Sequence, residues 1–211
     1  MKLEIKCQES YSRGELILRT LFGWIYIAIP HMFLLFFMGL WGSILQFISW
    51  WIILFTGRYP QSFFEFQVKL MRWSTRVHAR QLNLSDDYPA FGLDAQDEYT
   101  NVEVAYPESL SRGTLLLKTF FGWLYVGLPH GFMLYFRALA TYFVTFIAWW
   151  VILFTGKYPE SWHRFNVGTL RWAMRVNLYM SYMTDDYPPF SGRPDEEINP
   201  QLAMPKNEGQ A

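Results

Sequence analysis

Two long apolar stretches alternate with two amphipathic stretches along the chain. The apolar stretches cover residues 16–55 and 115–154 and contain few polar side chains. As α-helix, ~40 residues reach about 60 Å, which is twice the hydrocarbon thickness of a bilayer. The pattern therefore predicts two membrane crossings per stretch, with tight turns at residues 39–43 and 137–142. Arg137 favours the second turn, because a cation there would lie at the membrane surface.

Each apolar stretch ends at the same short motif. The sequence Trp-Trp-Ile-Ile-Leu-Phe-Thr-Gly-Arg-Tyr-Pro at residues 50–60 returns at residues 149–159 with two substitutions, Val151 and Lys157. Gly and Pro end a helix, whereas Tyr and the cations prefer the level of the lipid headgroups. The motif predicts that both copies leave the membrane at this point.

A second arrangement of the apolar stretches stays open. In it, a re-entrant half-helix over residues 16–29 precedes one crossing over residues 32–56, with the break at Pro30 and, in the second copy, at Pro129. The polar linker of residues 57–113 cannot cross the bilayer, so one crossing per copy would invert the second copy. Two crossings keep both copies parallel and the basic flanks on one side, which the positive-inside tendency favours.

A different kind of helix is predicted after each apolar stretch, over residues 60–84 and 159–183. Its cations and Glu65 fall in one sector at 3.6 residues per turn, and apolar side chains fill the other side. This pattern is typical of an amphipathic helix lying at the membrane interface. The residues that we expect to contact lipid headgroups or a partner are Arg58, Arg72, Arg76, Lys157, Arg171 and Arg175.

Weak alternation of apolar and polar residues predicts a short strand at the start of each copy. Because a strand cannot stand alone, we expect the two strands to pair with each other or with a partner's edge. The predicted fold is an all-α integral membrane protein of two parallel repeats, each with a short N-terminal strand, a transmembrane helical hairpin and an interfacial amphipathic helix. The predicted boundaries are repeat 1 at 1–92 with its strand at 2–7 and hairpin at 14–57, a linker at 93–100, repeat 2 at 101–190 with its strand at 101–106 and hairpin at 113–156, and a disordered tail at 191–211.

The two copies are related by a constant displacement, since Pro30 aligns with Pro129 and 129 − 30 = 99. The same displacement relates Asp86-Asp87-Tyr88-Pro89 to Asp185-Asp186-Tyr187-Pro188, and no gap is needed over residues 3–91. An internal repeat is therefore established before any fold is considered.

Four motifs of the repeat carry a resemblance to a known family. They are the Pro-His pair, Phe-Thr-Gly-Arg/Lys-Tyr-Pro, Arg-Trp-x-x-Arg-Val and Asp-Asp-Tyr-Pro-x-Phe. Together they resemble the bacterial membrane domains catalogued as domain of unknown function 4389, over nearly all of each copy. The second copy keeps Thr184 and Pro189, where the first departs with Ser85 and Ala90. The resemblance implies a bacterial membrane protein and no particular activity.

Composition narrows the class of protein further. Aromatic residues make up 20% of the 211 residues, which suits a protein that populates the headgroup regions of a membrane. Eighteen basic and eighteen acidic residues cancel, which removes the main electrostatic reason to expect a nucleic-acid partner. The single cysteine, Cys7, has no companion for a disulfide or a CxxC metal site.

His31 and His130 are candidate ligands, because each follows a Pro within an apolar stretch. Paired histidines could bind haem or a metal. The structural interpretation, which we favour, is that each His bonds a carbonyl group left free by the Pro or caps a helix. On this interpretation the protein has no cofactor and no metal.

The acidic pairs Asp86-Asp87 and Asp185-Asp186 could act as a general acid and base or bind a cation. We favour a structural role, in which they end the amphipathic helices and pair with the arginines at 72, 76, 171 and 175. The sequence contains no catalytic triad order, phosphate loop or HExxH motif. The chain is therefore not expected to be an enzyme.

These patterns predict a multi-pass protein of the bacterial inner membrane, with cytoplasmic termini. Its expected function is that of a non-enzymatic accessory or scaffold subunit, with lipids and a membrane-protein partner or a second copy as contacts. The first alternative is a transporter or channel for lipid or a small solute. The second is a haem- or quinone-binding oxidoreductase subunit.

Overall fold

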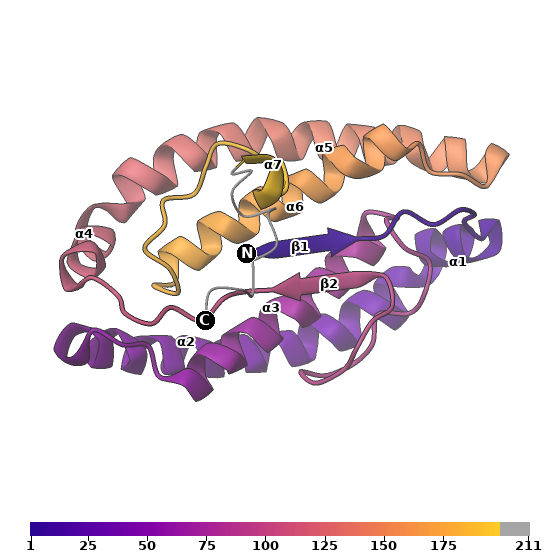
Figure 1. Ribbon diagram of the computed structural model, residues 1–211. Coiled ribbons are helices and arrows are strands. Elements are labelled where there is room, and N and C mark those ends of the chain that lie inside the picture. The colour runs from indigo at the N-terminus through magenta and orange to yellow at the C-terminus, as the bar shows by residue number, and fades with distance from the viewer. Residues whose placement is uncertain (199–211) are drawn as a thin grey trace, which may run out of the picture.

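The computed structural model describes residues 1–198 as two repeats with the same order of elements (Figure 1). A short strand comes first, then a long bent helix, then a shorter helix that folds back along it. In the first repeat these are β1 (Lys2–Ile5), α1 (Arg13–Gly23), the π-helical turn η1 (Trp24–Ala28), α2 (Ile29–Thr56) and α3 (Gln61–Gln81). In the second they are β2 (Thr100–Glu103), α4 (Arg112–Gly122), η2 (Trp123–Gly127), α5 (Leu128–Thr155) and α6 (Glu160–Met180), followed by α7 (Asp195–Ile198).

The long helix of each repeat is continuous, so the predicted hairpins are wrong. α1, η1 and α2 join into one run of 44 residues, and α4, η2 and α5 join into another of 44. The predicted turn at residues 39–43 lies inside α2, where Gly42 is buried against α3. The Gly42 carbonyl accepts a hydrogen bond of 2.6 Å from Gln67 Nε2. The missing side chain at Gly42 thus permits close helix packing and makes no turn.

The second predicted turn fails because the protein itself satisfies Arg137. This residue lies inside α5, where its Nε donates to Thr169 Oγ1 at 3.0 Å and its Nη2 donates to the Phe165 carbonyl at 3.2 Å. Its guanidinium also lies 4.5 Å from the centre of the Phe165 ring. A cation with these partners needs no headgroup, and α5 continues past it.

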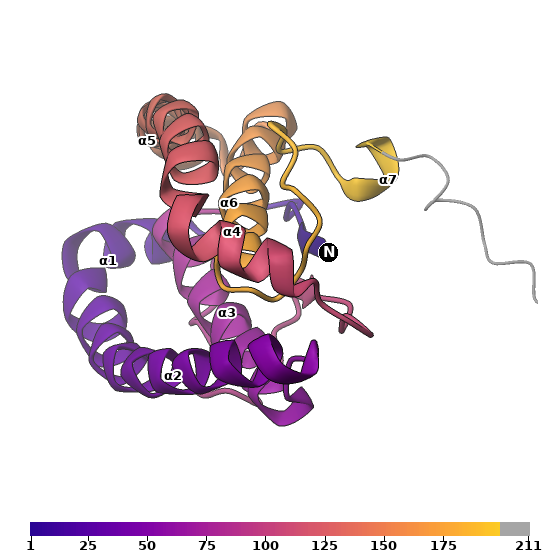
Figure 2. The same ribbon diagram turned by 90° about the vertical axis from the view of Figure 1, so that its left-hand side faces the viewer.

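The helices bend before Pro30 and Pro129 but do not break there (Figure 2). Pro30 lacks an N–H, which leaves the carbonyl of Tyr26 without its helical donor. Tyr88 Oη supplies that donor at 3.0 Å. The equivalent bond of the second repeat joins Tyr187 Oη to the Tyr125 carbonyl at 3.1 Å. A tyrosine of the Asp-Asp-Tyr-Pro motif therefore performs the task that the sequence assigned to His31 and His130, and that assignment is corrected.

The predicted strands are confirmed, and they pair with each other. β1 and β2 are antiparallel, with Lys2 opposite Glu103 and Ile5 opposite Thr100. α3 and α6 confirm the helices predicted at 60–84 and 159–183. Side chains of both repeats, among them Leu3, Ile53 and Ile152, belong to one core cluster.

Contacts between the repeats come in equivalent pairs. The amide of Tyr11 donates to the Gly156 carbonyl at 2.8 Å, and the amide of Leu110 donates to the Gly57 carbonyl at 2.8 Å. Both glycines have left-handed backbones, with φ of 72° and 71°, and end the long helices. The displacement of 99 turns one of these two bonds into the other with the roles of the repeats exchanged. The repeats are therefore related by an approximate two-fold rotation.

Apolar side chains are exposed almost entirely on the two long helices. α2 buries a narrow stripe that includes His31, Leu45 and Ile53, whereas most of its remaining apolar side chains are exposed, such as Phe36 at 61% and Phe55 at 71%. α3 lies between α2 and β2, and α6 lies between α5 and β1 (Figure 1). By length and composition, the described residues contain two helical runs able to span a membrane.

Part of the predicted disordered tail is ordered. Asp195 binds the N-terminal ammonium group at 2.7 Å and also pairs with Arg175. Residues 191–198 therefore close over α6 and β1, because two cations hold them. The remainder of that prediction, residues 199–211, lies outside the described residues.

Candidate functional site

Each Pro-His pair is the centre of a buried aromatic cluster. His31 is fully buried, and its Nδ1 accepts a hydrogen bond of 2.9 Å from Trp73 Nε1. Phe91 stacks on the imidazole with ring centres 3.9 Å apart. The equivalent values for His130 are 2.9 Å to Trp172 and 3.8 Å to Phe190. Since Nδ1 accepts in both clusters, both imidazoles are neutral and carry their proton on Nε2.

The two clusters differ at the second ring nitrogen. His130 Nε2 lies 3.1 Å from Tyr187 Oη, so its proton is donated to that hydroxyl, which in turn donates to the Tyr125 carbonyl. His31 Nε2 is buried without a partner among the described residues. The second repeat thus contains an unbroken chain of donors from Trp172 to Tyr125.

The clusters do not fit an axial haem ligand or a metal ligand. The Nδ1 atoms are occupied by tryptophan, the ring of His130 is occupied at both nitrogens, and a phenylalanine covers one face of each ring. Within residues 1–198 no group of three His, Cys, Asp or Glu side chains is placed to hold a metal ion.

The first member of each acidic pair fixes the start of a long helix. Asp86 accepts from the Ser12 amide at 2.5 Å and from Arg19 Nη2 at 3.4 Å. The equivalent Asp185 accepts from the Ser111 amide at 2.6 Å and from Lys118 Nζ at 2.9 Å. The predicted pairing of these aspartates with Arg72, Arg76, Arg171 and Arg175 is therefore wrong. Asp87 and Asp186 are exposed.

Three of the predicted headgroup cations are buried and bind backbone carbonyl groups of the protein. Arg76 donates to the carbonyls of Ala95 at 2.8 Å and Gly92 at 2.6 Å, and burial lowers its pKa. Arg175 donates to the carbonyls of Ser191 and Arg193 at 2.8 and 2.7 Å. These bonds hold the segments that follow the Asp-Asp-Tyr-Pro motifs.

The third buried cation and its half-buried equivalent bind the strands. Arg171 Nη2 donates to the Leu3 carbonyl and Arg72 Nε to the Val102 carbonyl, both at 2.8 Å. Each bond occupies an outward-facing carbonyl of a two-stranded sheet, which blunts an edge that could pair with another chain. Of the six predicted headgroup cations, only Arg58 and Lys157 are exposed, and they lie at the ends of the long helices. Lipid contact by these two stays a prediction.

Trp73 and Trp172 are the principal site residues that the sequence did not reveal. Both are the Trp of the Arg-Trp-x-x-Arg-Val motif, for which the sequence indicates no partner. Their separation from the histidines, 42 residues in both repeats, is a signal that could have paired them.

His163 distinguishes the repeats, because its equivalent is Phe64 (163 − 99 = 64). Its ring is 4% exposed, and Nε2 lies 3.3 Å from the Leu84 carbonyl, to which its N–H donates. Burial lowers the pKa of His163, although the bond to Leu84 and the charge of Glu160 act in the opposite direction. The folded protein therefore holds this histidine neutral.

We expect acid to destabilise the protein through His163. The pKa of His163 is lower in the folded protein than in the unfolded chain, where it is about 6.5. Its contribution to the free energy of unfolding is therefore complete above pH ~6.5 and is lost as the pH falls through the folded pKa. Each unit of difference is worth about 1.4 kcal/mol. Thermal unfolding followed between pH 7.5 and 5 measures the loss.

The matched control is His163→Phe, which copies the first repeat. The Leu84 carbonyl keeps a second donor, Tyr11 Oη at 3.2 Å, so the variant leaves no orphaned group. We expect a flatter pH profile in this variant. An unchanged acid loss would assign the effect to other groups.

Comparison with known families agrees with the repeat. The model of the family described as domain of unknown function 4389 matches residues 15–92 and again residues 117–192. No curated protein and no solved structure matches the chain.

Proposed function

The chain belongs to the family of domain of unknown function 4389, with two tandem copies, and that description names no activity; we propose that it is a non-enzymatic accessory or scaffold protein of the bacterial inner membrane. In this proposal both long helices lie within the cytoplasmic leaflet, roughly parallel to the membrane surface. The strands, their flanking loops and both termini face the cytoplasm, where a partner protein or a second copy is bound.

The observation that carries the proposal is the separation of apolar and charged surface. Exposed aromatic and aliphatic side chains cover α1, α2, α4 and α5, whereas α3 and α6 expose Glu65, Glu160 and Arg164. Water would have to cover an apolar surface far larger than soluble proteins tolerate. A leaflet covers it with acyl chains.

The packing of α3 on α2 favours the in-plane orientation over a crossing. Gln67 binds Gly42, halfway along α2, and the exposed Glu65 and the ion pair of Lys69 with Asp94 lie close to Gln67 on α3 and its loop. If α2 crossed the bilayer, these charges would lie near its centre, at a cost of ~2.5 kcal/mol or more each. In the in-plane orientation they lie at the headgroups.

The buried polar groups support a structural role over a catalytic one. His130, Asp86, Asp185 and the buried arginines Arg76, Arg171 and Arg175 are satisfied by the side chains, helix starts and carbonyl groups described above, and His31 is bonded at Nδ1. The transporter alternative lacks the crossings it requires in this orientation, and the His clusters do not fit the haem alternative.

Cysteine labelling tests the orientation, using equivalent positions of the two repeats. In a Cys7→Ser background, single cysteines replace Glu65 and its equivalent Arg164, both exposed on the polar helices, or Phe36 and its equivalent Tyr135, exposed at 61% and 60% on the long helices. A membrane-impermeant maleimide is applied to right-side-out and inside-out vesicles.

We expect positions 65 and 164 to react from the cytoplasmic side alone, and positions 36 and 135 to react from neither side. Native Cys7, which is exposed, should also react from the cytoplasmic side alone. Reaction of positions 65 and 164 from opposite sides would establish one crossing per repeat and overturn the proposal. Reaction of positions 36 and 135 with the reagent in water would exclude membrane embedding.

A further inference from the structure

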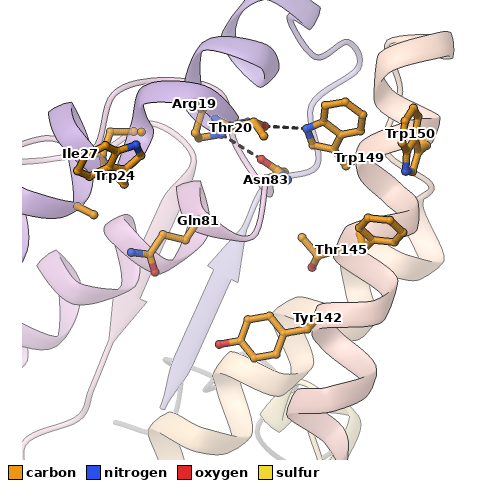
Figure 3. Close-up of a pocket in the computed structure, with 13 residues that line it drawn as sticks. Arg19, Thr20, Trp24, Ile27, Gln81, Asn83, Tyr142, Thr145, Trp149 and Trp150 are labelled. Atoms are coloured by element: carbon orange, nitrogen blue, oxygen red, sulfur yellow. Dashed lines mark hydrogen bonds between the residues drawn. The ribbon is translucent and has the colours of Figure 1, made fainter.

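A cleft of about 670 Å³ lies between the first half of the long helix of repeat 1 and α5 of repeat 2. Its apolar wall consists of aromatic and aliphatic side chains from both helices (Figure 3). These wall residues are Trp24, Ile27, Phe146, Trp149 and Trp150. Trp149 is fixed by its hydrogen bond to Thr20 Oγ1 at 2.7 Å, so this wall is held across the repeat boundary.

The cleft has polar groups but offers no net charge. Arg19 is 9% exposed and donates to Asn83 Oδ1 at 3.0 Å, to the Ser85 carbonyl at 3.0 Å and to Asp86. Its charge is therefore balanced inside the protein. The amide of Gln81 and the hydroxyl of Tyr142, by contrast, are exposed and form no hydrogen bond with the described residues. These two groups are neutral donors available to a ligand.

We propose that this cleft binds one acyl chain of a membrane phospholipid, with the ester carbonyl oxygen accepting a hydrogen bond from Tyr142 or Gln81. The inference rests on the proposed function, because the cleft opens among the exposed apolar residues of the long helices. A cleft of this size facing hydrocarbon is filled by acyl chain, since close packing recovers dispersion contacts. Water is a poor occupant, because each molecule needs two to four polar partners.

The two repeats make this site asymmetric. The equivalent cleft is smaller, about 480 Å³, and is lined by Phe47, Trp50, Trp51 and Tyr182 among others. There Met180 replaces Gln81, and its Cε lies 3.1 Å from the point where a Cβ on Gly122 would lie. Ser43 replaces Tyr142. The second cleft is thus smaller and lacks both proposed donors; its lining amide, Gln46, takes the place of Thr145 and of neither donor, so we assign the site to the first cleft alone.

Photocrosslinking tests this assignment in the full chain. The protein is placed in phosphatidylcholine bilayers that contain a phosphatidylcholine with a diazirine on one acyl chain, irradiated, and digested for mass spectrometry. We expect labelling of residues 142–150 to exceed that of the equivalent residues 43–51 by about fivefold, which corresponds to roughly 1 kcal/mol of binding free energy. Replacing the probe by the anionic phosphatidylglycerol analogue should leave the ratio unchanged, because the cleft is neutral.

Two variants and a matched control make the result specific. Ala28→Phe fills the cleft that Ala28 lines, and Tyr142→Phe removes a donor from a side chain that is 68% exposed. Both should lower labelling of 142–150. Gly127→Phe, the equivalent of Ala28 outside either cleft, should not, because a Cβ at Gly127 meets only ordinary contacts at 3.8 and 3.9 Å.

The outcomes separate the two proposals. Equal labelling of both clefts and of the exposed face of α2, unchanged in Ala28→Phe and Tyr142→Phe, would overturn the lipid site and leave the embedding intact. Absence of labelling on every exposed apolar face would overturn the embedding as well. A labelled wild type with loss in Tyr142→Phe supports the site even if Ala28→Phe does not fold.

Discussion

Replacing Asp97 by Ala is expected to destabilise the protein by ~3–5 kcal/mol, the usual effect of leaving one member of a buried ion pair alone. Asp97 binds Arg80 through two bonds, Nη1 to Oδ2 at 2.8 Å and Nη2 to Oδ1 at 3.0 Å. Their side chains are 5% and 1% exposed. Burial by itself raises the pKa of Asp97, but the hydrogen bonds from Arg80 and Thr100 prevail and lower it. The carboxylate is therefore ionised, and its removal strands the guanidinium.

Two controls show whether the lost charge partner is the cause. Lys69→Ala removes an ion pair with Asp94 whose members are 39% and 81% exposed, so we expect a loss below ~1 kcal/mol. The double variant Arg80→Leu/Asp97→Leu should lose less than Asp97→Ala, since no buried charge stays unpaired. Thermal and denaturant unfolding in the same detergent measure all three. A double variant less stable than Asp97→Ala would contradict this account.

The Arg80–Asp97 pair also illustrates which interactions the sequence could not predict. In the second repeat Tyr179 takes the place of Arg80 (80 + 99 = 179), so the cation of the pair is missing there. Tyr179 instead bonds the hydroxyl of Tyr125 at 2.9 Å. Comparison of the two copies identifies residues that recur in both. The Arg80–Asp97 pair occurs in the first copy alone, so this comparison does not predict it. Periodicity placed Arg80 on a polar face, but only the fold shows that the segment before β2 covers that face.

Local patterns predicted the elements well where the physical rule is local. Alternation revealed β1 and β2, and the period of 3.6 revealed α3 and α6. The hairpins failed because their prediction compared helix length with bilayer thickness, whereas each apolar stretch belongs to one continuous helical run of 44 residues. A helix that packs along its length on a neighbouring helix, as α2 packs on α3 through Gly42 and Gln67, needs no turn at this point.

The partners of the charged residues were predicted less well than the residues themselves. The sequence paired Asp86 with Arg76, ten positions away, whereas Asp86 binds Arg19 on α1 and Arg76 binds loop carbonyls. The short separation in sequence favours the pairing of Asp86 with Arg76. Arginine has five N–H donors, however, and a loop with several unpaired carbonyls satisfies more of them than one carboxylate does.

The His clusters yield the second large effect, because each imidazole is the acceptor for a buried tryptophan. His31→Phe keeps the stacking on Phe91 but removes the acceptor of Trp73 Nε1, whose side chain is buried. An unsatisfied buried donor costs ~1–3 kcal/mol. We expect His31→Phe to lower stability by that amount. His31→Asn should lose less, since its Oδ1 occupies the position of Nδ1.

A double-mutant cycle separates the hydrogen bond from packing. Trp73→Phe removes the donor, so adding His31→Phe to it should cost less than His31→Phe costs alone, with a coupling energy of ~0.5 kcal/mol or more. Additive losses would show that the hydrogen bond contributes nothing beyond packing.

The same substitution at His130 should be the more damaging of the two. His130→Phe removes the acceptor of Trp172 and also the donor to Tyr187 Oη. His31 has no such second bond to lose, because its Nε2 has no partner among the described residues. Tyr187 Oη in turn donates to the Tyr125 carbonyl that Pro129 leaves free. Loss of the His130 bond therefore weakens this hydrogen bond as well and destabilises the bend of the long helix. We expect the unfolding midpoint of His130→Phe to fall several degrees below that of His31→Phe, with roughly 1 kcal/mol equal to about 2–4 °C for a chain of this size. Adding Tyr187→Phe should remove the difference between the effects of the two His→Phe substitutions on the unfolding midpoint. Equal midpoints of His31→Phe and His130→Phe in the protein that keeps Tyr187 would contradict the role of the donor chain.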